Sequence, residues 1–309
     1  MNPFRFGVQL SKAPTGRAWR DLARRVESLG YSTLFIPDHF DDQLAPIAAL
    51  TSAAEATETL HVGSLVFDND YRHPLVLAKE MATLDLLSEG RVEVGLGAGW
   101  QRSDYDQSGI AYDPPAVRVA RLQESVAIMK ALWQQDNVTF EGDHYRIAGA
   151  RGLPRPHTKP HPPIIIGGGS PKVLALAAAE ADIIGINPSL VAGHIGPDIT
   201  AQLRIEQYRK RLDWVREAAG ERFGKLELQC LTFIVNVGQP RDEVLERIAP
   251  LLSLAPAEAA KVPLALVGTV EEIVETLLGR RVELGLSYWV VHEPELDAFA
   301  EVVAALAGH

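Results

Sequence analysis

The sequence is poor in cysteine: Cys230 is the single one among 309 residues. One cysteine excludes a framework of intrachain disulfides and a metal cluster held by several thiolates. No run of apolar residues approaches the ~18 that a membrane span requires. The first ten residues, MNPFRFGVQL, also lack the charged start and long apolar stretch of a signal peptide. We therefore expect a cytoplasmic protein.

Positive charge is also scarce. The chain carries 30 Lys and Arg against 40 Asp and Glu, which gives a net charge of −10, and no basic run is interleaved with aromatic residues. This balance argues against a nucleic-acid surface. No H-x-H pair stands at the end of a predicted strand, so we expect no metal site. Apolar residues make up 47% of the chain, enough for a large core. An enzyme acting on a small molecule fits these properties best.

The stretch 61–100 organises the chain. A short apolar run at 62–66 leads into a polar loop, and Pro74 then opens a helix with apolar residues three and four apart up to residue 87. A second apolar run at 92–96 leads into glycines. Parallel strands joined by a helix place the loops that follow them at one edge, where α/β proteins build their sites.

The same alternation runs through the whole chain and predicts a single (β/α)8 barrel domain over residues 1–309. An open doubly wound sheet is the alternative, but the first strand–helix turn lacks a G-x-G-x-x-G fingerprint. Beyond 62–66 and 92–96, the predicted strands are 4–10, 33–36, 164–166, 183–186, 226–237 and 288–291. The predicted helices are 19–29, 45–56, 74–87, 119–133, 172–179, 202–219, 242–252, 270–284 and 295–306.

Insertions are expected after the fourth and sixth units. Residues 138–147 predict a hairpin that turns at Gly142-Asp143, and five prolines at 148–163 exclude a helix or a central strand there. We interpret 138–163 as an excursion over the surface. The weakly patterned segments 187–200 and 253–266 are candidate lid loops.

The second predicted strand ends in Asp38-His39. A histidine at this edge can transfer a proton near neutral pH, and a neighbouring carboxylate can fix its tautomer. Equally, Asp38 can cap the next turn while His39 only packs. The last strand ends at His292, which either faces the site or is a hydrogen-bonded residue at the rim.

Three further strand ends are candidate ligand-binding segments. The polar loop from Ser64 to Asn69 is either part of a pocket or an ordinary loop. The small residues Gly97, Ala98 and Gly99 admit a flat ligand close to the backbone, with Trp100 as a wall, or they serve close strand packing. Gly167, Gly168, Gly169 and Ser170 open a helix, which favours a phosphate. The alternative there is a tight turn with a serine cap.

Six segments occur in an order that resembles the bacterial luciferase-like flavin monooxygenase superfamily, and most closely its branch that uses the deazaflavin coenzyme F420. They are FIPDHF, VGSLVFDNDYRHP, LDLLSEGRVEVGLGAGW, PPAVRVARLQESVAIMKALW, VTFEGDHYRI and PPIIIGGGS. The resemblance covers nearly the whole chain. It implies a (β/α)8 barrel with the cofactor ring at the carboxyl ends of the strands.

The resemblance also implies roles for particular residues. A non-prolyl cis peptide at Ser64-Leu65 would form a bulge behind the ring, and Gly97, Ala98 and Gly99 would form a wall beside it. Asp38 would contact the ring, and His39 would be the catalytic residue that assists proton transfer. The glycines Gly167, Gly168 and Gly169 with Ser170 would hold the cofactor phosphate. Trp100, Phe67 and His292 would line the substrate pocket. Helices 45–56 and 74–87 would form a homodimer interface.

One departure from that branch bears on the substrate. Its sugar-phosphate dehydrogenases carry a catalytic glutamate after the fourth strand, where this chain has Trp100. An aromatic wall suits a neutral, flat substrate better. The leading hypothesis is therefore F420-dependent hydride transfer to or from a C=C, C=N or C=O group or an alcohol. The alternative is an FMN-dependent monooxygenase that uses reduced flavin and oxygen.

Overall fold

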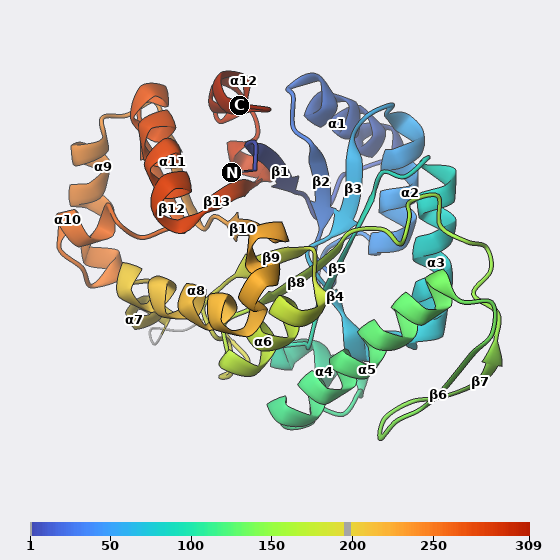
Figure 1. Cartoon of the computed structure of the whole chain (residues 1–309). Helices are drawn as coiled ribbons and strands as arrows, with labels where there is room; N and C mark the ends of the chain where they lie inside the picture. Colours follow the sequence, from blue (N-terminus) through green and yellow to red (C-terminus); the bar gives the residue numbers. More distant parts are fainter. Residues whose placement is uncertain (1, 195–198) are drawn as a thin grey trace.

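The computed structural model describes residues 2–194 and 199–309. Eight parallel strands form a closed barrel, which confirms the predicted (β/α)8 fold (Figure 1). Each strand pairs with the next in chain order, and the last pairs with the first. The barrel strands are β1 (Arg5–Gln9), β2 (Thr33–Ile36), β3 (His61–Ser64), β5 (Val92–Gly97), β8 (Ile164–Gly168), β9 (Ile183–Ile186), β10 (Glu227–Leu231) and β13 (Leu286–His292).

Helices cover the outside of the barrel (Figure 1). They are α1 (Gly16–Ser28), α2 (Pro46–Ala56), α3 (Pro74–Leu87), α5 (Pro115–Gln134), α6 (Pro171–Glu180), α8 (Ile205–Ala219), α11 (Val270–Leu284) and α12 (Ala300–Leu306). Local sequence explains their starts. Thr15 accepts a hydrogen bond from the Ala18 N–H at 3.1 Å, Thr269 and Glu272 form a reciprocal capping box, and Pro74 opens α3 as predicted.

Buried apolar side chains form two layers. A large cluster fills the space between the strands and the helices. A smaller cluster contains Phe35, Ile165, Tyr288 and Val290, which alternate along their strands with members of the first. This alternation is what a strand requires when its two faces point into and out of a barrel. The inner layer supports the cavity described below.

The first insertion follows β5. It contains α4 (Arg102–Ser108), which the sequence did not predict, and the predicted hairpin of β6 (Val138–Glu141) and β7 (Arg146–Ala150). The hairpin projects away from the barrel (Figure 1). Its turn spans 142–145 rather than two residues, because the carboxylate of Glu124 accepts hydrogen bonds from three successive N–H groups, those of Asp143, His144 and Tyr145.

The predicted strand 226–237 is wrong as a single element. It is divided into β10, in the barrel, and β11 (Ile234–Val237), which pairs with β12 (Ala265–Gly268) in a separate two-stranded sheet. The division falls where the chain changes partners: Thr232 donates its N–H to Val290 O, whereas Phe233 donates to Leu264 O. The residues between β10 and α11 therefore leave the barrel and form a third insertion, after the seventh barrel strand.

Residues 253–266 belong to that third insertion and do not form a lid. They contain α10 (Pro256–Ala259) and run into β12, and none of them lines the cavity at the barrel mouth. Arg280, on α11, fixes this segment by donating hydrogen bonds to four carbonyl groups between residues 260 and 265. These hydrogen bonds hold the segment against α11 and away from the cavity.

No helix among the described residues is long and apolar enough to cross a bilayer. The remaining elements are short. They are β4 (Phe67–Asp68), α7 (Ile199–Gln202), α9 (Arg241–Ile248), and the 3₁₀ helices η1 (Asn69–Tyr71), η2 (Gly220–Lys225), η3 (Pro250–Leu252) and η4 (Glu293–Glu295).

Candidate active site

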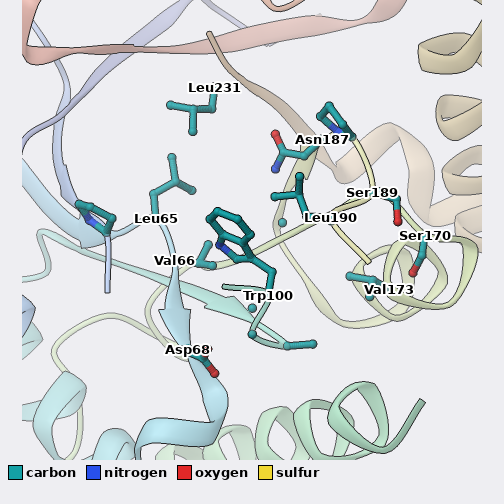
Figure 2. Close-up of a pocket in the computed structure, with 18 of the residues that line it drawn as sticks. Leu65, Val66, Asp68, Trp100, Ser170, Val173, Asn187, Ser189, Leu190 and Leu231 are labelled. Atoms are coloured by element: carbon teal, nitrogen blue, oxygen red, sulfur yellow. The ribbon is translucent and has the colours of Figure 1, made fainter. Parts of the chain in front are cut away.

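A cavity of about 350 Å³ opens at the carboxyl ends of the barrel strands (Figure 2). Most of the residues singled out from the sequence line it, although they come from separate strand ends. They are Asp38, His39, Leu65, Gly97, Ala98, Gly99, Trp100, Gly167, Gly168, Gly169, Ser170 and His292. Pro188, Ser189, Leu190, Val191 and Ile199 of the predicted lid 187–200 also line it; residues 195–198 of that lid lie outside the described residues.

Two predicted residues do not line the cavity. Ser64 is fully buried, and its hydroxyl donates to Ile36 O at 2.9 Å. Phe67 is also fully buried in the layer between strands and helices, where the guanidinium of Arg72 lies 5.4 Å from its ring centroid. Both side chains therefore support the wall from behind, and neither is a pocket residue.

The non-prolyl cis peptide joins Leu65 to Val66, one residue later than predicted. Ser64 still belongs to β3, and Leu65 N–H donates to Ile36 O at 3.0 Å, so the chain stays paired with β2 through this point. Only beyond Leu65 does the backbone turn. Leu65 and Val66 both line the cavity, and Gln9 donates to Leu65 O at 2.7 Å.

The glycines after β5 serve packing as well as the cavity wall. A Cβ at Gly97 would lie 2.6 Å from Val66 Cγ2. Gly99 has φ +74, and a Cβ there would lie 1.8 Å from the Tyr105 hydroxyl. The two alternatives from the sequence, a flat cavity wall and close packing of the backbone, therefore both apply. The same missing side chains leave room for Val66 and Tyr105 and keep the wall flat.

His39 is oriented by a carboxylate other than the one next to it in sequence. Asp38 forms an ion pair with Arg72 and accepts the Asp68 N–H at 3.1 Å. His39 Nδ1 instead lies 2.6 Å from Oδ2 of Asp104, which is 0% exposed. The prediction that Asp38 fixes the histidine tautomer is therefore wrong.

Asp104 lies in α4, 65 residues beyond the histidine, and is held by further donors. Tyr71 donates its hydroxyl to Asp104 Oδ2 at 3.2 Å, and Gln101 donates to Oδ1 at 3.1 Å. The ring of His39 also meets the ring of Trp100 edge-on, with 5.6 Å between centroids. Because α4 has no clear periodicity in the sequence, no local signal identifies Asp104.

Asp68 is a second acidic residue that the sequence did not single out. It lines the cavity, and the Tyr105 hydroxyl lies 3.1 Å from its Oδ2. Burial raises the pKa of the Asp68 carboxyl to about 7. This group therefore titrates near neutral pH inside the cavity.

The glycine loop between β8 and α6 lines another part of the cavity wall, where Figure 2 labels Ser170. Ser170 is the N-cap residue of α6 but makes no side-chain cap hydrogen bond, so the simple reading of a serine cap does not hold. A Cβ at Gly169 would lie 2.3 Å from Asn187 O. Glycine at this position therefore lets the loop pack against the backbone of residues 187–189. The loop itself lies at the positive end of a helix, which favours an anion.

Apolar side chains fill much of the remaining lining. Trp100 lies at the centre of the view in Figure 2, with Leu65, Leu190 and Leu231 around the same space. At the rim, Nε2 of His292 lies 2.9 Å from the carbonyl oxygen of Thr232. His292 is thus both a cavity residue and a hydrogen-bonded one.

Comparisons with known proteins agree with this architecture. The sequence model of the luciferase-like monooxygenase family matches residues 1–288. An F420-dependent glucose-6-phosphate dehydrogenase from Amycolatopsis mediterranei is 34% identical over 174 residues, which cover 53% of this chain and 52% of that protein. An FMNH2-dependent dimethylsulfone monooxygenase from Pseudomonas putida is 28% identical over 198 residues, 60% of this chain and 54% of that protein. The chain thus spans about half the length of these curated relatives.

Solved structures extend the likeness over the whole fold. The coenzyme F420-dependent tetrahydromethanopterin reductase from Methanopyrus kandleri superposes with a TM-score of 0.78, covering 98% of this chain and 99% of the other. The two sequences are only 17% identical. This likeness establishes the shared barrel.

Proposed function

Because this chain belongs to the luciferase-like monooxygenase family, we propose that it is an oxidoreductase that transfers a hydride between coenzyme F420 and a small organic substrate. The observation that carries the proposal is the His39–Asp104 pair on the wall of a cavity at the barrel mouth. The F420-dependent relative from Amycolatopsis mediterranei supports the choice of cofactor.

The residues of the cavity fit a flat ring with a phosphate tail. Gly97, Ala98 and Gly99 leave one wall without bulky side chains, and Leu65 and Val66 line the same cavity. The segment from Gly167 to Ser170 presents backbone N–H groups at the N-terminus of α6, where a phosphate is favoured. These segments would hold the two ends of the cofactor.

A bound deazaflavin supplies a carbon that donates or accepts a hydride. His39 handles the accompanying proton. Since Nδ1 is engaged by Asp104 at 2.6 Å, Nε2 is the nitrogen left to exchange a proton with the substrate. The ring of Trp100 meets the ring of His39 at a right angle. The protein therefore positions the proton donor beside an aromatic wall.

The lining favours a neutral substrate. Trp100, Leu190 and Leu231 give the cavity an apolar wall near His39, and Arg118 is the one Lys or Arg among the described residues that line it. We propose a substrate with a C=C, C=N or C=O group, or an alcohol in the reverse direction. A sugar phosphate, the substrate named for the Amycolatopsis relative, is disfavoured.

The second candidate is an FMN-dependent monooxygenase with the same cavity. The relative from Pseudomonas putida favours it, because that protein is named for FMNH2. In that case the same cavity would hold the flavin, and His39 would hold a proton beside it.

We also propose that the chain forms a homodimer through α2 and α3. Val76, Leu86 and Leu87, near the two ends of α3, are large apolar side chains between 46% and 57% exposed, and association with a second copy would cover them. Light scattering of the wild-type protein and of Leu87→Lys tests this, because one buried charge per subunit would shift the dimer to monomer.

Binding titrations with F420 and FMN, followed by tryptophan fluorescence, test the choice of cofactor. We expect quenching at low-micromolar F420, because Trp100 lies in the cavity, and much weaker binding of FMN. The reverse preference supports the monooxygenase. Binding of neither contradicts both candidates.

The His39→Ala variant tests the catalytic role. We expect turnover with F420, monitored at its visible absorbance against a panel of ketones, imines and enones, to fall by about 10²- to 10⁴-fold. Affinity for F420 should change little. His157→Ala is the matched control, since His157 is exposed and lies outside the cavity. Unchanged turnover of His39→Ala would remove this residue from the mechanism.

A further inference from the structure

Two histidines line the cavity, and they are held by different partners. Of the nine histidines in the chain, only His39 and His292 are among the described residues that line it. His39 Nδ1 lies 2.6 Å from a carboxylate oxygen of Asp104, whereas His292 Nε2 lies 2.9 Å from the carbonyl oxygen of Thr232. Within the described chain, the His292 ring has no second hydrogen-bond partner. The two rings therefore offer different chemistry to a ligand.

The partner of His292 fixes the proton on its ring. A carbonyl oxygen only accepts hydrogen bonds, so Nε2 carries the proton and donates it to Thr232 O. Nδ1 of the neutral ring then has a lone pair and no proton, which makes it an acceptor. Thr232 is 0% exposed, and its N–H and hydroxyl both donate to Val290 O at 2.9 Å. Because the carbonyl that orients His292 is itself held in place, Nδ1 is a fixed acceptor.

His39 provides the complementary donor. The fully buried carboxylate of Asp104 stabilises the protonated form of His39, and Nε2 can then donate to an oxygen of the substrate. His292 receives no such stabilisation, since the residues that the structure describes offer its ring a carbonyl and no ion-paired carboxylate. One part of the wall thus carries a proton donor and another carries an acceptor.

The two histidines lie where two cavities join. A second cavity is lined by polar side chains that include Lys12, Asp42 and Gln43, and His39 and His292 line both cavities. Strand β1 lies between β2 and β13, so the strand ends from which the two histidines come are two spacings of about 4.8 Å apart. A small molecule with two neighbouring oxygen atoms can bridge the rings through two hydrogen bonds of about 2.8 Å.

We infer that the substrate is an α-hydroxy ketone or aldehyde and that His292 is the residue that recognises its hydroxyl. The inference rests on the proposed function and narrows its substrate class. His39 Nε2 donates to the carbonyl oxygen, and the hydroxyl on the next carbon donates to His292 Nδ1. The carbonyl carbon accepts the hydride from reduced F420, which is thereby oxidised, and the carbonyl oxygen takes the proton from His39. The product is a 1,2-diol, and in the reverse direction a 1,2-diol is oxidised.

The test compares two ketones that differ only in the group next to the carbonyl. Acetoin carries a hydroxyl there, and 3-fluoro-2-butanone carries a fluorine, which is of similar size and cannot donate a hydrogen bond. Fluorine activates the carbonyl at least as strongly, so a higher efficiency with acetoin does not come from reactivity. With reduced F420 we expect the wild-type kcat/KM to be about tenfold higher for acetoin, the contribution of one hydrogen bond. Equal or lower efficiency with acetoin overturns the inference without the need for a variant.

The His292→Phe variant assigns the preference to this ring. Phenylalanine keeps a planar ring but removes the acceptor, so the ratio of kcat/KM for acetoin to that for the fluoro ketone should fall about tenfold. This ratio does not depend on how much of a preparation is folded, so a merely structural role of His292 would leave it unchanged. An unchanged ratio overturns the inference.

The matched control is His161→Phe. A ring nitrogen of His161 also lies 2.8 Å from a backbone carbonyl, that of Pro162, but His161 does not line the cavity. We expect the wild-type ratio in this variant. A fall equal to that in His292→Phe would contradict a specific role of His292 and overturn the inference.

Failure of the inference differs from failure of the proposed function. Protein that binds F420 but reduces neither ketone overturns the inference and leaves the choice of cofactor in place. Protein that does not bind F420 contradicts the proposed function and, with it, the inference.

Discussion

Buried polar and charged groups are paired to different extents at the two ends of the barrel. At the amino-terminal end, Glu93 is 1% exposed and contacts Arg5 as an ion pair, while the Tyr288 hydroxyl donates to its Oε2 at 3.0 Å. At the carboxyl end Asp38 and Arg72 also form an ion pair, but among the residues that the structure describes Arg118 has no carboxylate partner, and Asn187 and Gln229 each leave one buried amide atom unpaired.

We interpret the paired groups as serving stability and the unpaired groups as serving the candidate site. Charges that are satisfied within the chain hold the closed end of the barrel together, and their loss leaves a partner buried and unpaired. Polar atoms left without partners at the open end lower stability unless something binds them. We therefore expect substitutions at the two ends to affect different measurements.

The largest effect is expected at the closed end. Glu93→Ala should lower the free energy of unfolding by about 3 kcal/mol, because it removes one of the two carboxylates that pair with Arg5 and leaves the buried hydroxyl of Tyr288 without its acceptor. Urea denaturation measures this loss. Glu55→Ala, at an exposed position on α2, is the control. A loss below about 1 kcal/mol, the range of an exposed pair, would break the contrast between the two ends.

A smaller effect, on turnover, is expected from Asp104→Asn. Asparagine keeps the shape of Asp104 but cannot stabilise a protonated His39, so kcat should fall by about 10²-fold, the low end of what a positioned proton donor contributes. Affinity for the cofactor should stay near the wild-type value. Asp106→Asn, an exposed position on the same helix, is the control. A wild-type pH profile in Asp104→Asn would show that this carboxylate does not act through the histidine.

The last effect concerns pH and is confined to the range in which Asp68 titrates. The pKa of Asp68 is raised from 3.8 to about 7 by burial, so between these values the folded protein holds a proton that the unfolded chain releases. Stability therefore decreases as pH rises from about 4 to about 7 and then levels off. Asp68→Asn should remove this slope, and its advantage over the wild type should be larger at pH 8 than at pH 5.

Urea midpoints at the two pH values measure the Asp68 effect, with the exposed Asp143→Asn as the control. An equal difference between Asp68→Asn and wild type at both pH values would mean that this carboxyl titrates at its ordinary value.

The sequence predicts the fold well because strand and helix patterns are local. The helix 74–87 and the strands 33–36 and 183–186 are confirmed at both ends. Pattern alone cannot show a change of partner, so the apolar run 226–237 was predicted as one strand although Thr232 and Phe233 hydrogen-bond to different segments.

The residues of the candidate site also fall into two groups, those that the sequence predicts and those that it does not. His39 and the loop from Gly167 to Ser170 could be identified because they directly follow strands, and the barrel brings all strand ends together. Asp104 and Arg118 could not, because neither directly follows a strand: Asp104 contacts His39 from α4, and Arg118 lines the cavity from the start of α5, through packing that has no signature in sequence spacing. Phe67 was misplaced because one residue of register decides which face of a strand a side chain takes.

The close contact between Gly97 and Val66 has a consequence for how this pocket can diversify. Any side chain at Gly97 would collide with Val66, so the wall beside the proposed ring is closed to mutational change. Trp100 and Leu190 lie on loops that tolerate substitution. New substrate preferences should therefore arise in those loops while the glycine wall stays invariant, and a library aimed at altered specificity should leave the wall untouched.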